Sequence, residues 1–353
     1  MHTRLASIML AFAAFYPLCA GCAAESVAIA SIVEAAKKEG ILTMSYGGAL
    51  GGPAGAKELE GMVNKRFGTN LKFNFTPGPA APEMAARIGQ EALANRPSST
   101  DIFFSSITAS NAPLFQVIEW PSLVPGLPEE ALKHSRRSVT ISTHLIGMTY
   151  NTQLIPPDKA PKSLADLLQP QFKGKVTARI STTFMSYLAL PELLGKEGSI
   201  EFFRRFGQQA TGMARCGSWE QIASGEILIF FPDCGDYMAR VGQRAGAPLG
   251  HIIPQEGAGF AVNAIGVPNN SAHPNVAKLL ILLLLSPEGQ NFIWEKDGTD
   301  SYLMPGSRIA KIMQEKKLQG VKFFDEIEIE ETRPDLVQAQ KDMFTALQIG
   351  LQR

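Results

Sequence analysis

An excess of charge of either sign is what this 353-residue chain lacks, because Lys plus Arg and Asp plus Glu both number 33. Nucleic acids and anionic membranes attract strongly basic proteins, so we exclude both as partners. Catalytic signatures are also missing: the chain has no G-x-S-x-G elbow, no H-E-x-x-H motif and no phosphate-binding P-loop. The five histidines form no tight ligand pair in the sequence. We therefore expect a binding protein that needs no cofactor, and not an enzyme.

Long apolar runs are scarce as well. One spans residues 5–18, after a short basic stretch and before small residues at 20–24. A membrane span needs about 20 apolar residues, so this pattern predicts a signal peptide over 1–24 and export to the periplasm. Cleavage after Ala24 is the favoured interpretation. The alternative is a lipoprotein signal acylated at Cys22, although Cys19 stands where such signals usually carry Leu.

Cysteine is rare, and export decides how it is interpreted. Removal of the signal leaves only Cys216 and Cys234. In an oxidising compartment two lone cysteines pair more often than they bind metal, so we expect a disulfide; two reduced, buried thiols are the alternative.

The length and the order of elements predict two α/β lobes. The chain exceeds what one hydrophobic core usually organises. Strands expected over 41–46, 71–75 and 101–104 alternate with helices over 56–67 and 83–93, which predicts a parallel sheet with ligands at its carboxyl edge. Candidate ligand-binding residues at these strand ends are Ser45, Tyr46, Gly47, Gly48, Ser105 and Ser106. The glycine-rich loop from Gly47 is interpreted either as backbone that approaches a ligand or as a flexible connection.

A second set of polar residues follows the strands expected in the later half. Arg179 ends one strand and precedes hydroxyls at Thr182 and Thr183, before a helix expected to run through Leu190. A helix N-terminus with hydroxyls and an arginine suits a carboxylate or phosphate; the alternative is that Arg179 faces solvent or pairs with a carboxylate of the protein. Asp233 and Tyr237 follow the next expected strand.

The region 144–176 carries a family resemblance. It has a strand, Tyr150-Asn151, a proline-containing linker, Ser163-x-x-Asp-Leu-Leu and then Lys-Gly-Lys-Val. This order resembles the first interlobe crossover of the solute-binding proteins of ABC importers, and most of all the ferric-iron-binding group. Segments 32–45, 191–206 and 273–289 are similar to other parts of that family.

The resemblance implies a two-lobed type 2 periplasmic-binding fold, each lobe a mainly parallel sheet flanked by helices. Lobe 1 would comprise 25–150 and 262–353, and lobe 2 would comprise 151–261. It also implies a monomer that delivers a small solute to an inner-membrane permease, with Tyr302 near the cleft.

One departure from the iron binders bears on the ligand. They carry two adjacent tyrosines where this chain has Asp236 and Tyr237, which together would be the metal ligands if iron is bound. Arg179, the glycine loop and the helix starts favour an anion such as an organic acid or phosphoryl compound, whereas the two aspartates favour a cation. We expect an anion, with ferric iron as the alternative.

Overall fold

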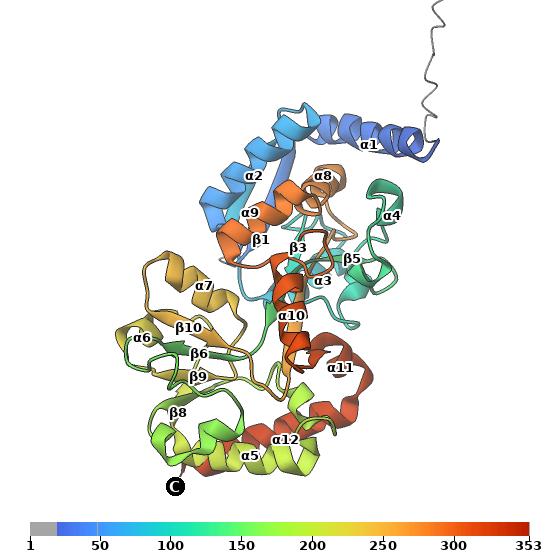
Figure 1. The fold of residues 1–353 in the computed structure, drawn as a ribbon. Coiled ribbons are helices and arrows are strands. Elements are labelled where there is room, and N and C mark those ends of the chain that lie inside the picture. Colours follow the sequence, from blue (N-terminus) through green and yellow to red (C-terminus); the bar gives the residue numbers. More distant parts are fainter. Residues whose placement is uncertain (1–19, 48, 353) are drawn as a thin grey trace, which may run out of the picture.

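The computed structural model describes residues 20–47 and 49–352, with side chains from residue 27 onward. The signal peptide expected over 1–24 and the acylation of Cys22 therefore lie outside the described residues or side chains. Figure 1 shows two α/β bodies, one above the other, joined by strands in the middle of the molecule. The two-lobed α/β fold class is confirmed.

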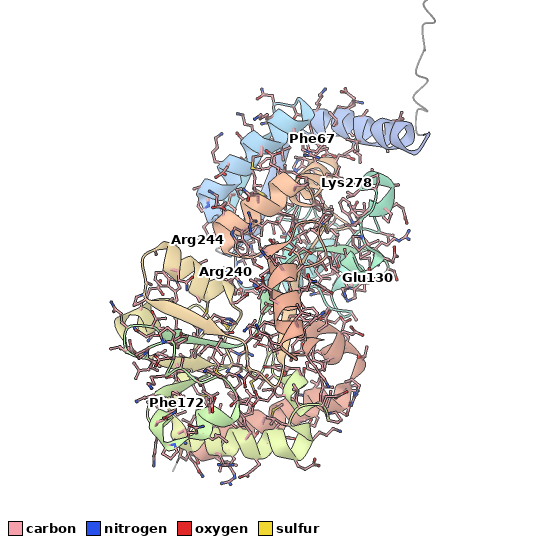
Figure 2. All side chains as sticks on the ribbon, viewed as in Figure 1. Phe67, Glu130, Phe172, Arg240, Arg244 and Lys278 are labelled. Atoms are coloured by element: carbon pink, nitrogen blue, oxygen red, sulfur yellow. A yellow bond between two sulfur atoms is a disulfide. The ribbon has the colours of Figure 1, made fainter. Side chains whose placement is uncertain are left out.

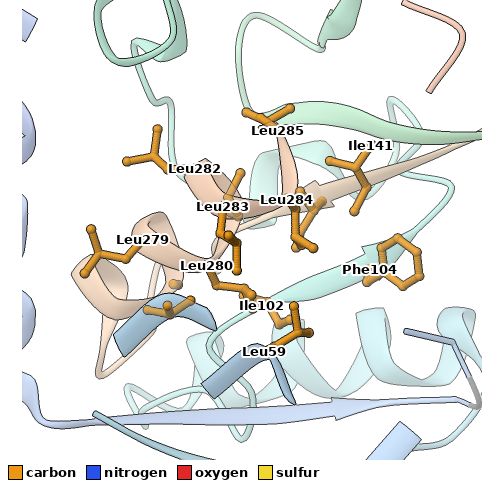
Figure 3. Packing of buried hydrophobic residues seen from close by; sticks show 14 of the residues in the cluster. Leu59, Ile102, Phe104, Ile141, Leu279, Leu280, Leu282, Leu283, Leu284 and Leu285 are labelled. Carbon is orange, nitrogen blue, oxygen red and sulfur yellow. The ribbon is translucent and has the colours of Figure 1, made fainter. Parts of the chain in front are cut away.

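The upper lobe holds a two-stranded parallel sheet of β1 (Ile41–Tyr46) and β2 (Lys72–Pro77). Its helices are α1 (Ala20–Glu39), α2 (Gly52–Phe67), α3 (Ala81–Leu93), α8 (Pro274–Leu284) and α9 (Pro287–Asp297). The apolar run 279–285 is completely buried here, as expected, and its leucines contact Leu59, Ile102 and Ile141 in one core (Figure 3). Ser286 caps α9 by accepting a hydrogen bond from the Gly289 amide. Because this apolar run is buried in the core, it fixes the position of the start of α9. The position of the other end of that helix, at Asp297, follows from this.

A central sheet crosses between the lobes in the order β12 (Phe323–Asp325), β11 (Ala258–Gly266), β5 (Ser138–Leu145) and β4 (Leu132–Lys133). The strand expected over 101–104 is β3 (Phe103–Ser105), and it pairs antiparallel with β11. The expectation that it would join the parallel sheet of β1 and β2 is wrong. Its carboxyl end nevertheless lies near that of β1, because Phe104 and Ser105 line one cavity with Tyr46 and Gly47.

The lower lobe is built on a second five-stranded sheet, in the order β10 (Leu249–Ile252), β6 (Met148–Asn151), β9 (Ile229–Phe231), β7 (Val176–Arg179) and β8 (Ala210–Ala214). Strand β7 runs parallel to both neighbours. Three short or medium helices flank the sheet: α5 (Gly195–Gln209), α6 (Trp219–Ser224) and α7 (Tyr237–Arg244). Phe202, Phe203 and Phe206 of α5 pack around Phe231 of β9, which anchors this helix to the sheet.

The two crossovers between lobes are short and touch each other. The first is the turn at Ile146 and Gly147 between β5 and β6, and the second joins β10 to β11. A Cβ atom at Gly147 would overlap the carbonyl oxygen of Ile252, so glycine is required for the close approach. The first crossover, expected within 144–176, is therefore the short break between β5 and β6, and the proline-containing linker that follows lies beyond it.

The C-terminal segment holds α10 (Arg308–Leu318), α11 (Glu326–Thr332) and α12 (Pro334–Leu351). Helix α12 packs along α5 at the bottom of Figure 1, with Gly207 and Gly350 at the closest approach. The expected lobe boundaries stay a prediction, but this helix of the range 262–353 contacts lobe 2.

Short helical turns complete the described chain. They are α4 (Trp120–Leu123), η1 (Ala112–Leu114), η2 (Glu129–Ala131), η3 (Ala165–Leu168), η4 (Pro170–Phe172) and η5 (Ser186–Ala189). The helix expected after Thr183 and through Leu190 is only the turn η5, because the chain before it forms a turn in which Phe184 adopts a positive φ. Among the described helices no single one is long and apolar enough to cross a membrane, although the pair α8–α9, bent by 83°, meets those two criteria jointly.

Candidate functional site

A cavity of about 240 Å³, here called the cleft cavity, opens at the carboxyl ends of β1 and β3. Its described lining carries no charged side chain and consists of Tyr46, Gly47, Ala49, Pro79, Ala80, Ala81, Phe104, Ser105 and Asn263. Residues 79–81 are the start of α3, a helix end that no side chain caps. The positive end of the α3 dipole therefore lies at the cavity wall, where it favours a negatively charged group.

Tyr46 is the buried polar group of this cavity. Its side chain is 5% exposed, and its hydroxyl has no hydrogen-bond partner among the described residues. Burial and the nearby Asp297 raise the pKa of Tyr46 above its usual value, so the hydroxyl keeps its proton. A buried donor without a partner costs free energy, and a ligand oxygen would recover it only if solute binding uncovers this hydroxyl.

The glycine loop after β1 is hydrogen-bonded to the C-terminal end of α9. Asp297, at the end of α9, accepts a hydrogen bond from the Leu50 amide at 2.8 Å. Burial raises the pKa of Asp297 to about 6, although its bonds to the Leu50 and Gly51 amides act in the other direction. These amides serve an internal carboxylate, so the part of the loop that lines the cavity is the part before them, at Gly47 and Ala49. Gly48 lies outside the described residues.

A row of side chains continues from the cavity into lobe 2. The side-chain amide nitrogen Nδ2 of Asn263 on β11 lies 2.5 Å from the imidazole Nε2 of His144 on β5. His144 in turn packs edge-on against the ring of Tyr237, the first residue of α7, with centroids 4.7 Å apart. Ser105, Asn263, His144 and Tyr237 thus form a polar path from one lobe to the other.

The titratable members of this path are electrically neutral near pH 7. Burial lowers the pKa of His144 to about 4; Asp236 opposes this shift and Arg240 adds to it. Burial, together with the carboxylates of Asp233 and Asp297, raises the pKa of Tyr237 to about 12. The path therefore offers hydrogen bonds without a net charge of its own.

Arg179 lies behind this path and not in the cleft cavity. It is 1% exposed, and its Nη1 donates to the Asp233 carbonyl oxygen at 3.0 Å. Its Nε and Nη2 have no partner among the described residues, while its guanidinium lies over the ring of Phe184. Burial lowers the pKa of Arg179 to about 10, so it stays charged, and this charge acts on Tyr237. Its role as a direct ligand remains a prediction.

In the loop after β7, the hydroxyl side chains contact one another. Ser181 Oγ lies 2.9 Å from Thr183 Oγ1, and Thr183 is exposed whereas Thr182 is half-buried. In lobe 1 Ser45 is buried, and Ser106 donates to the Val262 carbonyl. Of the candidates taken from the sequence, the cleft cavity brings together Tyr46, Gly47 and Ser105.

The two aspartates named as candidates are engaged inside the protein. Asp233 is fully buried and accepts hydrogen bonds from the Gly147 and Gly235 amides and from Thr149, with His251 Nε2 3.0 Å away. Burial acts to raise the pKa of Asp233, but His251 and these donors outweigh it, so the pKa is lowered. Asp236 is 2% exposed, accepts from the Leu145 amide and is paired with Arg240. Both carboxylates hold the crossover in place.

Tyr302 lies away from the path. It packs on Phe260, whose neighbours along β11 alternate between the two faces of the sheet. Phe260 and Leu145 face α10, whereas His144 and Asn263 face the cleft. The structure therefore places Tyr302 on the opposite face from His144.

The expected disulfide is confirmed. Cys216 and Cys234 are bonded, with Cα atoms 5.8 Å apart. They follow β8 and β9, which both pair with β7 in one sheet. The bond holds the segment that carries Asp233 and Asp236 against the lobe.

Sequence reasoning missed His144, Asn263 and the start of α3. The first two lie inside strands, where polar residues are ordinarily interpreted as solvent-facing. Their position at the two crossovers was an available signal, because crossover strands that pair bring their inward residues together. Pro82 in the first turn was the available signal for an earlier start of α3.

Comparison with known proteins decides the family. Residues 108–317, more than half of the chain, match the family model described as bacterial extracellular solute-binding protein. The chain belongs to this family. The solute-binding protein shares 24% identity over 240 residues with the Fe(3+)-binding periplasmic protein of Serratia marcescens, covering 64% of this chain and 69% of that one. An uncharacterized protein of Haemophilus influenzae is 25% identical over 43% of this chain, and the match spans only 46% of that relative.

Solved structures show the same fold. The solute-binding protein superimposes on the substrate-binding protein of an ABC transporter from Agrobacterium tumefaciens with a TM-score of 0.68, 16% identity and coverage of 87% and 94% of the two chains. Iron-bound HitA of Pseudomonas aeruginosa gives 0.65 at 17% identity, with coverage of 86% and 99%. The resemblance to this family and the type 2 periplasmic-binding fold are both confirmed. By its description, the family consists of extracellular solute-binding proteins.

Proposed function

We propose that this solute-binding protein captures a small anionic solute, an organic acid or a phosphoryl compound, in the cleft between its lobes. The observation that carries the proposal is the cleft cavity at the uncapped start of α3, with Tyr46, Ser105 and Asn263 in its lining. The cavity has no charged group in its described lining, so a cation would find no counter-charge there. The charge of Arg179 behind Tyr237 adds a favourable potential from lobe 2.

Capture would involve hinge closure at the two crossovers. The solute would contact Ser105 and Asn263 first, on lobe 1, and then Tyr237 as lobe 2 approaches. Closure is favoured only by the difference in affinity between the closed and open forms, which the second set of contacts supplies. The fixed positions of His144 and Tyr237 limit the ordering cost of these contacts.

Delivery follows from the family. We propose that the protein acts as a monomer in the periplasm, after cleavage of its signal peptide, and hands its solute to an ABC-transporter permease in the inner membrane. The proposed role is binding and not catalysis.

Ferric iron is the second candidate, and a specific observation supports it: the relative from Serratia marcescens carries an Fe(3+)-binding name. Tyr237 is half-buried at the cleft and would be its phenolate ligand. Asp236 does not suit this role, because its carboxylate is paired with Arg240 and bonded to the Leu145 amide. Among the described residues no group of three or more His, Cys, Asp or Glu side chains forms a metal site.

Native mass spectrometry of the mature protein, purified gently from periplasm, tests the proposal. We expect an adduct with the mass of a small organic or phosphoryl anion. An adduct of one iron atom, lost in Tyr237→Phe, would replace the anion proposal by the iron alternative.

A pair of variants then locates the solute. Ser105→Ala should weaken binding of the identified anion, whereas Ser110→Ala, an exposed serine outside the described cavity lining, should leave it unchanged. Arg179→Ala should also weaken an anion and leave a cation unaffected. Unchanged anion affinity in Arg179→Ala would remove this residue from the proposal.

A further inference from the structure

A larger cavity of about 780 Å³ lies on the other face of the crossover strands and is here called the hinge cavity. Leu145 and Phe260 on that face pack with α10, while His144 and Asn263 point the opposite way, toward the cleft. The first turns of α7 separate the two spaces: Tyr237 contacts His144, whereas Asp236 and Arg240 line the hinge cavity. The two cavities are therefore distinct.

The lining of the hinge cavity has a repeated chemistry. Four segments contribute to it, and their side chains include three cations, each with a glutamine nearby in sequence or in space: Lys162 with Gln255, Arg240 with Gln243, and Lys316 with Gln319. The first pair is adjacent because the Gln255 amide donates to the Lys162 carbonyl oxygen at 3.1 Å. Cations and amide donors that converge from three sides suit an oxyanion with more than one negative charge.

Two of the cations have no counter-ion. Within the described chain no carboxylate lies within ion-pair distance of the side chain of Lys162 or Lys316, and Lys316 Nζ contacts only Gln319, at 3.2 Å. The one carboxylate of the lining, Asp236, is already neutralised by Arg240. His251, the remaining titratable lining residue, faces Asp233. The side chains of the lining thus carry a net positive charge, from Lys162, Arg240 and Lys316 against Asp236.

We propose that the hinge cavity is a second binding site, for a small polyvalent oxyanion, at a place separate from the solute site in the cleft. Lys316 and Gln319 belong to α10 beside lobe 1, and the other four residues belong to lobe 2 or its crossover. An anion that bridges these walls fixes the angle between the lobes. By linkage, it changes the affinity of the cleft for its solute by the same factor by which that solute changes anion affinity.

Calorimetric titration of the mature protein with inorganic pyrophosphate in low salt tests this site. Saturable binding is expected, and Lys316→Gln and Lys162→Gln should each weaken it about tenfold, the effect of losing one charge-assisted hydrogen bond. Lys311→Gln is the matched control, because this lysine is exposed on the same helix and is not part of the lining. Equal weakening in Lys311→Gln would mean nonspecific attraction and overturn the proposal, as would the absence of saturable binding at millimolar pyrophosphate.

A cleft variant separates this site from the proposed function. Ser105→Ala should leave pyrophosphate affinity unchanged, because the hinge cavity lies on the other face of the crossover strands. Loss of pyrophosphate binding in Ser105→Ala, with normal binding in Lys316→Gln, would place the anion in the cleft and overturn the second site while supporting the first.

Discussion

The two faces of the crossover strands differ in chemistry although they belong to the same strands. The cleft face carries neutral groups, among them Asn263 and His144. The hinge face carries charged groups in contact, where Arg240, Arg244 and Arg308 all lie within 6 Å of the ring centre of Trp294. Strand alternation thus separates solute recognition from the contacts that set the position of lobe 2.

The charged face works as an interlobe contact. Arg240 donates to the Gly298 carbonyl oxygen and Arg244 to that of Glu295, both at 2.6 Å. Figure 2 labels both arginines on α7, where this helix faces α9 of the upper lobe. The arginines of this face bond one lobe to the other, whereas the hydrogen-bonding groups of the neutral face remain available to a ligand.

Asp233 joins the two faces, and its removal should have the largest effect. Asp233→Ala leaves two crossover amides and the Thr149 hydroxyl without their acceptor and His251 without its neighbour. We expect a loss of about 3–5 kcal/mol in the free energy of unfolding, measured by chemical denaturation. Asp158→Ala, at an exposed ion pair, should change it by less than about 1 kcal/mol. A small effect of Asp233→Ala would show that the faces are stabilised separately.

His144 should give the neutral face a distinct pH dependence. Its pKa falls from 6.5 in the unfolded chain to about 4 in the fold, so the unfolded state binds the extra proton first. Stability therefore falls as pH drops from about 6.5 to about 4, by roughly 2–3 kcal/mol. The measurement is the difference between wild type and His144→Gln across this range, which cancels the opposite contribution of Glu326, whose pKa burial raises to about 7. Parallel curves for the two proteins would contradict the neutral assignment.

Trp294→Leu should weaken the charged face. Three guanidinium carbons lie 4.8 to 5.9 Å from the centre of the indole ring. Leucine is also a large apolar side chain, but it has no aromatic ring to attract these cations. We expect a loss of about 1–2 kcal/mol in thermal or chemical denaturation. Phe67→Leu, which removes a single contact with Arg66 far from the hinge, is the control. An equal loss in both variants would argue against a cooperative interlobe contact.

Tyr46→Phe should have the smallest effect on stability and a selective effect on binding. The hydroxyl has no partner to lose, so the free energy of unfolding should change by less than about 1 kcal/mol. Affinity for the solute that co-purifies with the protein should fall about tenfold, by calorimetry. Unchanged affinity would remove the Tyr46 hydroxyl from the site.

Much of the fold was predictable because local patterns determine it. The uncharged run 41–46 predicted β1 to the residue, and the leucines of 279–285 predicted a buried helix. The pairing of Cys216 with Cys234 was likewise expected from their place after two strands. The antiparallel pairing of β3 with β11 was not predictable, because strand partners far apart in sequence are chosen by tertiary packing.

The site was predictable at its rim and not in its interior. Tyr46, Gly47 and Ser105 follow strands, and this position identified them. Asp233 also follows a strand, but whether its carboxylate faces a ligand or the amides of Gly147 and Gly235 depends on the geometry of the crossover turn. Tyr302 was expected at the cleft, yet the alternation of β11 places it beside Phe260 on the other face. Sequence position thus locates an edge of a sheet but not the direction of a side chain there.

The placement of the three tryptophans has an optical consequence. Trp120 is sealed in the core of lobe 1 and Trp219 lies on α6 of lobe 2, so neither spans the interface. Of the three, Trp294 is the one that contacts cations of two different elements, Arg240 of α7 and Arg308 of α10. Any change in the lobe angle would alter the electric field at this indole, and the emission of the unlabelled protein would then report hinge motion from a single known position.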